Sequence, residues 1–198
     1  RGPDSQALWD DDYVSLGHCR LAIQDLSEYS DQPYVTKKGG VLVYNGELYN
    51  CEALANKFLD NDKLLSSDTI ILAKLLDRYG TSIVPYLHGI FSFIYYDKKK
   101  QEVYSVRDSL GIKPLYWFKD NDGNHYYSSL FLTLAKKIGI KKIFLKPNDD
   151  FLMYGSLAGQ NIFNTGICEQ DPGTIRKHNL KTGKLERTKF QFSFLNEE

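Results

Sequence analysis

Residues 89–96 (GIFSFIYY) carry β-branched and aromatic side chains on both faces of an extended chain. A strand that is apolar on both faces must be covered on both sides, so this segment predicts a central strand of a layered domain. The lysine run 98–100 separates it from a second strand-like segment, residues 102–107, which predicts an antiparallel hairpin with a solvated turn. Further strands are predicted at residues 41–45, 125–128 and 173–179.

Two segments, residues 47–59 and 67–79, carry apolar side chains at helical spacing. In the second, Ser67 or Asp68 can cap the N-terminus, and Gly80 stands where a helix stop is expected. Several strands with two helices between them predict an α+β fold, in which layered antiparallel sheets are flanked by helices. Residues 139–170, rich in Lys, Gly and Asn, predict a loop-rich insertion within one domain spanning residues 1–198.

The composition argues against several functional classes. Lys and Arg together number 25, as do Asp and Glu, so the formal net charge is zero and no basic stripe for nucleic acid stands out. No apolar run approaches the roughly 20 residues of a membrane span, and the polar opening at Arg1 is unlike a signal peptide. The three cysteines lack metal-ligand spacing, so a disulfide framework or zinc site is not expected. They predict a reducing, intracellular location, with the cytoplasm favoured and an organelle left open.

The pair Asn45-Gly46 follows the apolar run 41–44. An Asn-Gly pair is first of all a turn former. It also places a side-chain amide beside an unshielded backbone N–H, and two such donors suit an oxyanion. From these two residues alone the turn is the favoured interpretation, and an oxyanion site is the alternative.

Several short blocks follow one another along the chain. They are Arg1-Gly2-Pro3-Asp4, Leu16-Gly17-His18-Cys19-Arg20-Leu21-Ala22-Ile23, Gln32-Pro33, Asn45-Gly46-Glu47, Ser67-Asp68-Thr69, Gly89-Ile90-Phe91-Ser92-Phe93 and Arg107-Asp108-Ser109-Leu110-Gly111-Ile112-Lys113-Pro114-Leu115-Tyr116. In this order they resemble the glutamine-hydrolysing domain of asparagine synthetases, a class II glutamine amidotransferase. The resemblance covers residues 1–135 and returns at 171–175, and it implies the layered fold of the N-terminal-nucleophile hydrolases.

The resemblance also implies roles for individual residues. Arg20 would hold the α-carboxylate of glutamine through its planar guanidinium, with a surface ion pair as the alternative. Glu47 and Asp68 would hold the α-ammonium, although Asp68 could also be a plain helix cap. Backbone groups around Leu21 and Ile23 would line the same pocket.

The same resemblance favours the oxyanion role for Asn45 and Gly46. The block from Arg107 to Pro114 is interpreted as architectural, with a buried Arg107–Asp108 pair beside a turn that contains Gly111, Lys113 and Pro114. His18 is predicted to be a core histidine with its hydrogen bonds satisfied.

In the family, the nucleophile is a cysteine at the processed N-terminus, shortly before the Arg-Gly-Pro-Asp block. Here that block begins at Arg1, so we expect the first strand and its nucleophile to be missing and the chain as given to be inactive. Cys19, Cys51 and Cys168 are each predicted to be small apolar fillers rather than substitutes. Leu130 stands where the family usually has a glutamate.

No Ser-Gly-Gly-x-Asp-Ser pyrophosphate loop of a synthetase domain occurs in the chain. ATP and Mg²⁺ are therefore implied only for a synthetase domain outside it, and no cofactor is expected here. Two hypotheses follow. In the first, the chain is the ammonia-releasing part of an asparagine-synthetase-like protein, whose partners are glutamine and a synthetase domain or partner chain. In the second, it is a non-catalytic amidotransferase-like scaffold.

Overall fold

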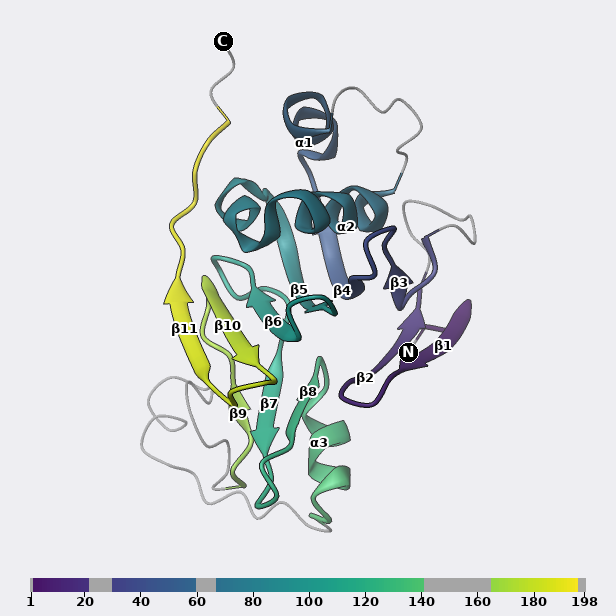
Figure 1. The fold of residues 1–198 in the computed structure, drawn as a ribbon, viewed down its shortest axis with the longest axis vertical. Coiled ribbons are helices and arrows are strands. Elements are labelled where there is room, and N and C mark those ends of the chain that lie inside the picture. The colour runs from purple at the N-terminus through teal and green to yellow at the C-terminus, as the bar shows by residue number, and fades with distance from the viewer. Residues whose placement is uncertain (1, 22–29, 60–66, 141–164, 196–198) are drawn as a thin grey trace.

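The computed structural model describes residues 2–21, 30–59, 67–140 and 165–195 (Figure 1). Its centre is a six-stranded antiparallel sheet, and helices cover one face of that sheet. In spatial order the strands are β11 (Leu185–Lys189), β10 (Thr174–Asn179), β6 (Glu102–Arg107), β5 (Gly89–Asp97), β4 (Val41–Leu48) and β3 (Tyr34–Val35). The covering helices are α1 (Cys51–Phe58), α2 (Asp68–Tyr79) and the 3₁₀ segment η2 (Gly80–Tyr86).

A second layer of strands lies against the other face of the sheet. It consists of the hairpin β1 (Ser5–Asp10) and β2 (Ser15–Arg20), and of a three-stranded sheet in the order β8 (His125–Ser128), β7 (Tyr116–Lys119) and β9 (Cys168–Glu169). The short helix α3 (Phe131–Lys137) packs on β7 and β8. The predicted α+β fold with layered antiparallel sheets is confirmed.

Strand β5 shows why the domain has layers on both sides. Phe91, Phe93 and Tyr95 belong to the core shared with α2, whereas Ile94 and Tyr96 belong to the core shared with the second layer. Successive side chains on a strand point to opposite faces, so an apolar run of this kind is stable only when both faces are buried. The hairpin to β6 through the lysine-rich turn is as predicted.

The Asn45-Gly46 pair is not a turn. It lies inside β4, where Gly46 pairs with Phe91 of β5, and the strand continues to Leu48. A Cβ at Gly46 would lie 2.6 Å from the Phe91 Cα, so the close approach of the two backbones requires glycine here. The helix predicted from residue 47 consequently begins only at Cys51, because Leu48 is a buried strand residue.

The helix predicted at 67–79 is α2, which ends at Tyr79 and is followed by Gly80 at a φ of 60°, a backbone conformation that favours glycine. Ser67 occupies the N-cap position, but its side chain makes no capping hydrogen bond. Of the predicted insertion, residues 141–164 lie outside the described residues. Its last part is not loop-like, since Ile167 is fully buried and β9 is followed by the buried Gln170.

The block that begins at Arg107 is architectural, but Arg107 and Asp108 are not each other's partners. The Arg107 guanidinium pairs with Glu169 at 2.7 Å and donates to the backbone carbonyls of Gln170 and Gly111. The Asp108 carboxylate, 1% exposed, accepts backbone N–H groups from four residues: Phe91, Leu110, Ile112 and Lys113. Each charged group is thus satisfied mainly by backbone, which fixes the loop from β6 to β7.

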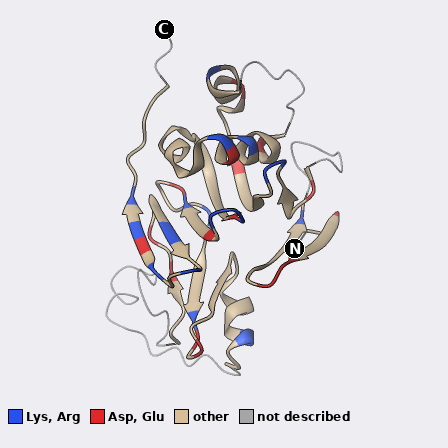
Figure 2. Ribbon diagram, viewed as in Figure 1, with Lys and Arg blue, Asp and Glu red and all other residues tan. Residues whose placement is uncertain are grey.

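Charges of both signs are interspersed over the ribbon (Figure 2), in keeping with the zero net charge. Within the described residues, no helix combines the length and the apolar composition that crossing a bilayer would require.

Candidate functional site

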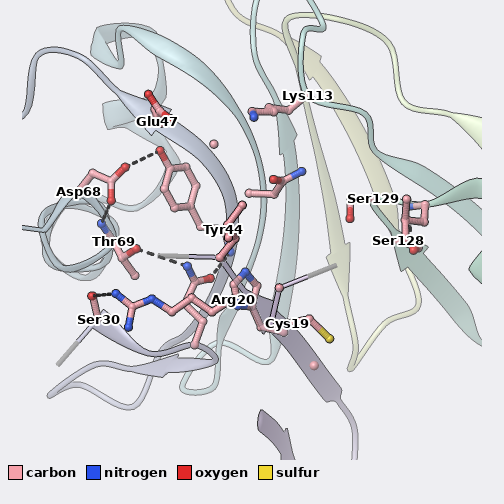
Figure 3. A pocket seen from close by; sticks show the side chains of 18 of the residues that line it. Cys19, Arg20, Ser30, Tyr44, Glu47, Asp68, Thr69, Lys113, Ser128 and Ser129 are labelled. Carbon is pink, nitrogen blue, oxygen red and sulfur yellow. Dashed lines mark hydrogen bonds between the residues drawn. The ribbon is translucent and has the colours of Figure 1, made fainter. Parts of the chain in front are cut away.

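A cavity of about 680 Å³ opens where both layers and α2 meet (Figure 3). Its walls come from the end of β2, the middle of β4, the start of α2 and the connection from β8 to α3. In Figure 3, Asp68, Thr69 and Ser30 lie on one side of it, and Ser128 and Ser129 lie on the opposite side. The volume falls within the range typical of small-molecule sites.

Arg20, the last residue of β2, places a cation on the cavity wall. It is only 9% exposed, and its guanidinium donates to Asp31 Oδ1 at 2.5 Å and to Ser30 Oγ at 2.7 Å. The other Asp31 oxygen accepts the Ser5 hydroxyl at 3.0 Å. The guanidinium of this ion pair is therefore buried and oriented, whereas the Asp31 side chain is 37% exposed.

Asp68 begins α2 and carries one of two carboxylates on the cavity wall. Its Oδ2 accepts the Tyr44 hydroxyl at 3.0 Å and the Leu48 N–H at 3.4 Å, while Oδ1 accepts the Thr69 N–H at 2.7 Å. Burial raises the pKa of Asp68 above its ordinary value, and the nearby Glu47 carboxylate adds to the rise, although the three hydrogen bonds oppose it. Burial, followed by the Asp68 charge, likewise raises the pKa of Tyr44.

Asn45, Gly46 and Glu47 follow one another on β4, and all three line the cavity. Side chains alternate along the strand, so Asn45 and Glu47 share a face, opposite to that of Tyr44. Glu47 and Asp68 both line the cavity, and two carboxylates that border one space favour a cation between them. The donors available from the Asn45 side chain and the Gly46 backbone lie on the same stretch of wall.

Two polar atoms of this wall are buried and have no hydrogen-bond partner in the described part of the chain: His18 Nδ1 and Ser67 Oγ. The expectation of a fully satisfied core histidine was therefore wrong. His18 is a half-buried residue of the cavity wall, and its Nδ1 is unpartnered among the described residues. A buried polar group without a partner costs about 1–3 kcal/mol.

The three thiols differ in their surroundings. Cys51 matches the expected filler: it is half-buried, donates to the Leu48 carbonyl at 3.4 Å, and burial raises its pKa to about 12. Cys168 lies half-buried in β9. Cys19, in contrast, is exposed and borders the cavity (Figure 3), so it is not a buried filler. It lies on β2 between His18 and Arg20, and its side chain leaves the opposite face of the strand.

The structure places six of the seven predicted site residues on this one cavity: Arg20, Leu21, Asn45, Gly46, Glu47 and Asp68. The seventh, Ile23, lies outside the described residues. Leu130 also lines the cavity, 36% exposed, where the family usually has a glutamate. Among the described residues, no three His, Cys, Asp or Glu side chains are grouped to hold a metal ion.

Sequence reasoning missed several residues that line the cavity or orient a residue that does. Lys113 was taken as architectural, and its backbone is, but its side chain lies at the cavity (Figure 3). Tyr44 had a usable signal, because it directly precedes the Asn-Gly pair. Asp31, which orients Arg20, had none, because the two residues meet only through the fold.

Comparison with known proteins assigns the chain to a family. Residues 1–191 match the family model described as glutamine amidotransferase domain. Over 121 residues, 59% of this chain, it is 40% identical to "Amidase chry2" of Gibberella zeae. Over 139 residues, 68% of this chain, it is 33% identical to "Asparagine synthetase [glutamine-hydrolyzing] 3" of Bacillus subtilis. These matches span 18% and 23% of the two relatives, so the chain corresponds to a minor part of each.

A solved structure supports the fold. The glutamine phosphoribosylpyrophosphate amidotransferase of B. subtilis superposes on 90% of this chain, with a TM-score of 0.60 at 20% sequence identity, and 35% of that protein is covered. Since the family model spans nearly the whole chain, this protein belongs to the glutamine amidotransferase domain family, in the type found in glutamine-hydrolysing asparagine synthetases.

Proposed function

We propose that the cavity binds glutamine and that the protein hydrolyses its side-chain amide, releasing ammonia for a synthetase domain or partner chain. The observation that carries this proposal is the placing of opposite charges around one cavity. Arg20 supplies a cation, and Glu47 and Asp68 supply two carboxylates. A free amino acid has a carboxylate and an ammonium on one carbon, so it matches both.

The guanidinium of Arg20 is suited to the α-carboxylate, because Ser30 and Asp31 hold its plane in a fixed orientation. The α-ammonium belongs with Asp68 and Glu47. Its positive charge would relieve their mutual repulsion and would return the pKa of Asp68 towards its ordinary value.

With the head group held there, the side-chain amide reaches the Asn45-Gly46 stretch of β4. The Asn45 amide and the Gly46 N–H would stabilise the oxyanion that forms when a nucleophile attacks the carbonyl carbon. Attack by a thiolate would give a thioester and expel ammonia, after which water would release glutamate.

We infer that the thiol comes from outside these 198 residues. Cys51 is too basic, Cys168 lies in β9, and Cys19 leaves the strand on the face away from Arg20. ATP and Mg²⁺ would bind to the synthetase module and not in this cavity. The acceptor of the ammonia is set by that module.

Calorimetric titration of the full chain with three ligands tests the proposal. L-Glutamine should bind, whereas glutaramate, which lacks the α-amino group, and 4-aminobutanamide, which lacks the α-carboxylate, should each bind roughly 10- to 150-fold more weakly. That loss corresponds to one charge-assisted hydrogen bond of about 1.5–3 kcal/mol. Equal binding of all three ligands, or of none, would remove the basis for the assignment.

An ammonia-release assay tests the nucleophile. The chain should release no ammonia from glutamine, and addition of an N-terminal Met-Cys-Gly segment should confer turnover. Turnover by the unextended chain that is lost in Cys19→Ala would show that the thiol lies within it. Glutamine binding without turnover after the extension would favour the non-catalytic scaffold.

A further inference from the structure

Strand β4 is paired along its whole length with β5 on one edge, but its opposite edge is only partly covered. The short strand β3 pairs with it at Val41 and Leu42. The same register would bring residue 32 opposite Tyr44, but the ladder stops at Tyr34. An uncovered strand edge presents backbone N–H groups that need acceptors from elsewhere.

Two side chains supply acceptors along this uncovered edge. The Tyr44 N–H donates to Gln32 Oε1 at 2.5 Å, and the Leu48 N–H donates to Asp68 Oδ2 at 3.4 Å. Backbone N–H groups two residues apart point to the same edge of an antiparallel strand, so the Gly46 N–H, midway between these two, points there as well. Among the described residues no acceptor is found for it on that edge, and Gly46 lines the cavity. Its N–H is therefore available to a ligand.

Gln32 is itself held in a fixed orientation. It is only 6% exposed, and its Nε2 donates to Thr69 Oγ1 at 3.4 Å, in the first turn of α2. A side-chain amide carries its acceptor and its donors on different atoms, so the bond to Thr69 leaves Oε1 as the atom that faces Tyr44. Gln32 thus ties β4 to α2 directly before the Asn45-Gly46 pair.

We propose that Gln32 is a positioning residue, which takes the place of a neighbouring strand at Tyr44 and thereby holds the Gly46 N–H towards the side-chain carbonyl of bound glutamine. This inference rests on the glutamine site proposed above. Without the Gln32 acceptor, the Tyr44 N–H is left unsatisfied, and its peptide gains by rotating towards another partner. Such a rotation displaces the backbone at Gly46, two residues further on. Gln32 therefore acts on the amide end of the ligand.

Two ligands separate the amide end of the site from the head-group end. L-Glutamine and L-norvaline share the head group and the length of the carbon chain, but norvaline ends in a methyl group and has no carbonyl oxygen for the Gly46 N–H. Calorimetry on the full chain gives the ratio of the norvaline to the glutamine dissociation constant. This ratio reports the amide contact, because a change at the head group affects both ligands alike. A residue that only stabilises the fold would not alter it.

Three variants test the role of Gln32. Gln32→Met keeps the size of the side chain and removes the acceptor for Tyr44, so the ratio should fall roughly 2- to 12-fold through weaker glutamine binding, as for one neutral hydrogen bond. Gln32→Glu keeps an oxygen that can accept the Tyr44 N–H, so it should retain most of the ratio. Asn50→Leu is the matched control, because the Asn50 amide also joins two backbone groups, donating to the Tyr86 carbonyl at 2.9 Å and accepting the His88 N–H at 3.0 Å, but does not line the cavity. It should lower the melting temperature and leave the ratio as in the parent chain.

The outcomes separate this inference from the glutamine site itself. A ratio that is unchanged in Gln32→Met, or reduced equally in Asn50→Leu, would overturn the positioning role and leave the glutamine site standing. A parent chain that binds norvaline as tightly as glutamine would overturn the amide contact. Absence of glutamine binding by the parent chain would overturn the site and this inference together.

Amide hydrogen exchange, followed by NMR in the parent chain, needs no variant. In the free chain the Tyr44 amide should exchange slowly, because Gln32 accepts its N–H, and the Gly46 amide should exchange faster. Saturation with glutamine should slow the Gly46 amide, whereas norvaline at equal occupancy should not. Equal exchange of the two amides in the free chain, or a Gly46 amide that glutamine does not protect, would contradict the proposed arrangement.

Discussion

Replacing Asp68 by Asn removes one charge from the proposed ammonium site and little else. In the parent chain Asp68 Oδ2 accepts the Tyr44 hydroxyl at 3.0 Å, and Oδ1 accepts the Thr69 N–H at 2.7 Å. The Asn side chain keeps one carbonyl oxygen, which can accept either of these donors. It cannot accept both sets of bonds, because its second terminal atom is a donor. Affinity for glutamine and stability of the free chain should therefore respond differently.

The expected loss of affinity is that of one charge-assisted hydrogen bond, about 1.5–3 kcal/mol, or a roughly 10- to 150-fold rise in the dissociation constant. The effect on stability combines two opposite contributions. One backbone or hydroxyl donor loses its acceptor, which costs about 1 kcal/mol, but the unfavourable burial of charge that raises the pKa of Asp68 disappears. We expect the melting temperature to change by less than about 4 °C.

The pH dependence has a definite sign. The pKa of Asp68 in the folded chain lies above the unfolded value of 3.8, so its favourable contribution to folding is complete below pH 3.8 and is lost as pH rises through the folded pKa. Glutamine binding needs the ionised form, so affinity should fall as pH falls through that same raised pKa. Asp68→Asn should abolish both effects.

Calorimetry and thermal denaturation across pH test this expectation. Asp77→Asn is the control, because Asp77 also lies on α2 and accepts a tyrosine hydroxyl, that of Tyr95 at 2.9 Å, but does not line the cavity. It should leave glutamine affinity unchanged. The reasoning fails if Asp68→Asn binds glutamine as tightly as the parent, or if its loss of affinity is matched by an equal loss in Asp77→Asn.

Three further outcomes follow from the packing. Gly46→Ala should lower the free energy of unfolding by about 1–3 kcal/mol in urea titration, because the added Cβ meets the backbone at Phe91; an unchanged midpoint would contradict the close approach. Asp108→Ala should destabilise the chain by roughly 3 kcal/mol or more, since the buried N–H of Phe91 and three partly buried N–H groups lose their acceptor, and a change below 1 kcal/mol would count against this. In the native chain at pH 8, iodoacetamide should modify the exposed Cys19 before Cys51, whose pKa is about 12; mass spectrometry showing the reverse order would refute it.

The local sequence was sufficient to predict an element where the apolar pattern of that element alone shows which of its faces are buried. Strand β5 and helix α2 were predicted because apolar periodicity gives their type directly. The short strands β1, β2 and β7 were not, since they mix polar and apolar residues and depend on partners elsewhere in the chain. Asn45-Gly46 was expected to turn because the pair favours turns locally, but its register with β5 overrides that preference.

The site shows the same division. The resemblance named the residues that line the cavity, whereas their orientation depends on contacts that no local pattern encodes. Asp31 against Arg20 and Tyr44 against Asp68 are such contacts, separated by 11 and 24 positions. The unpartnered Nδ1 of His18 is likewise visible only in three dimensions.

A crystal structure of the chain with L-glutamine is the most direct test of the central claim. The ligand carboxylate should lie on the Arg20 guanidinium and its ammonium between Glu47 and Asp68, with the side-chain carbonyl oxygen within hydrogen-bond distance of the Asn45 amide and the Gly46 N–H. Glutamine bound with its two ends exchanged, or bound outside the cavity, would contradict the account.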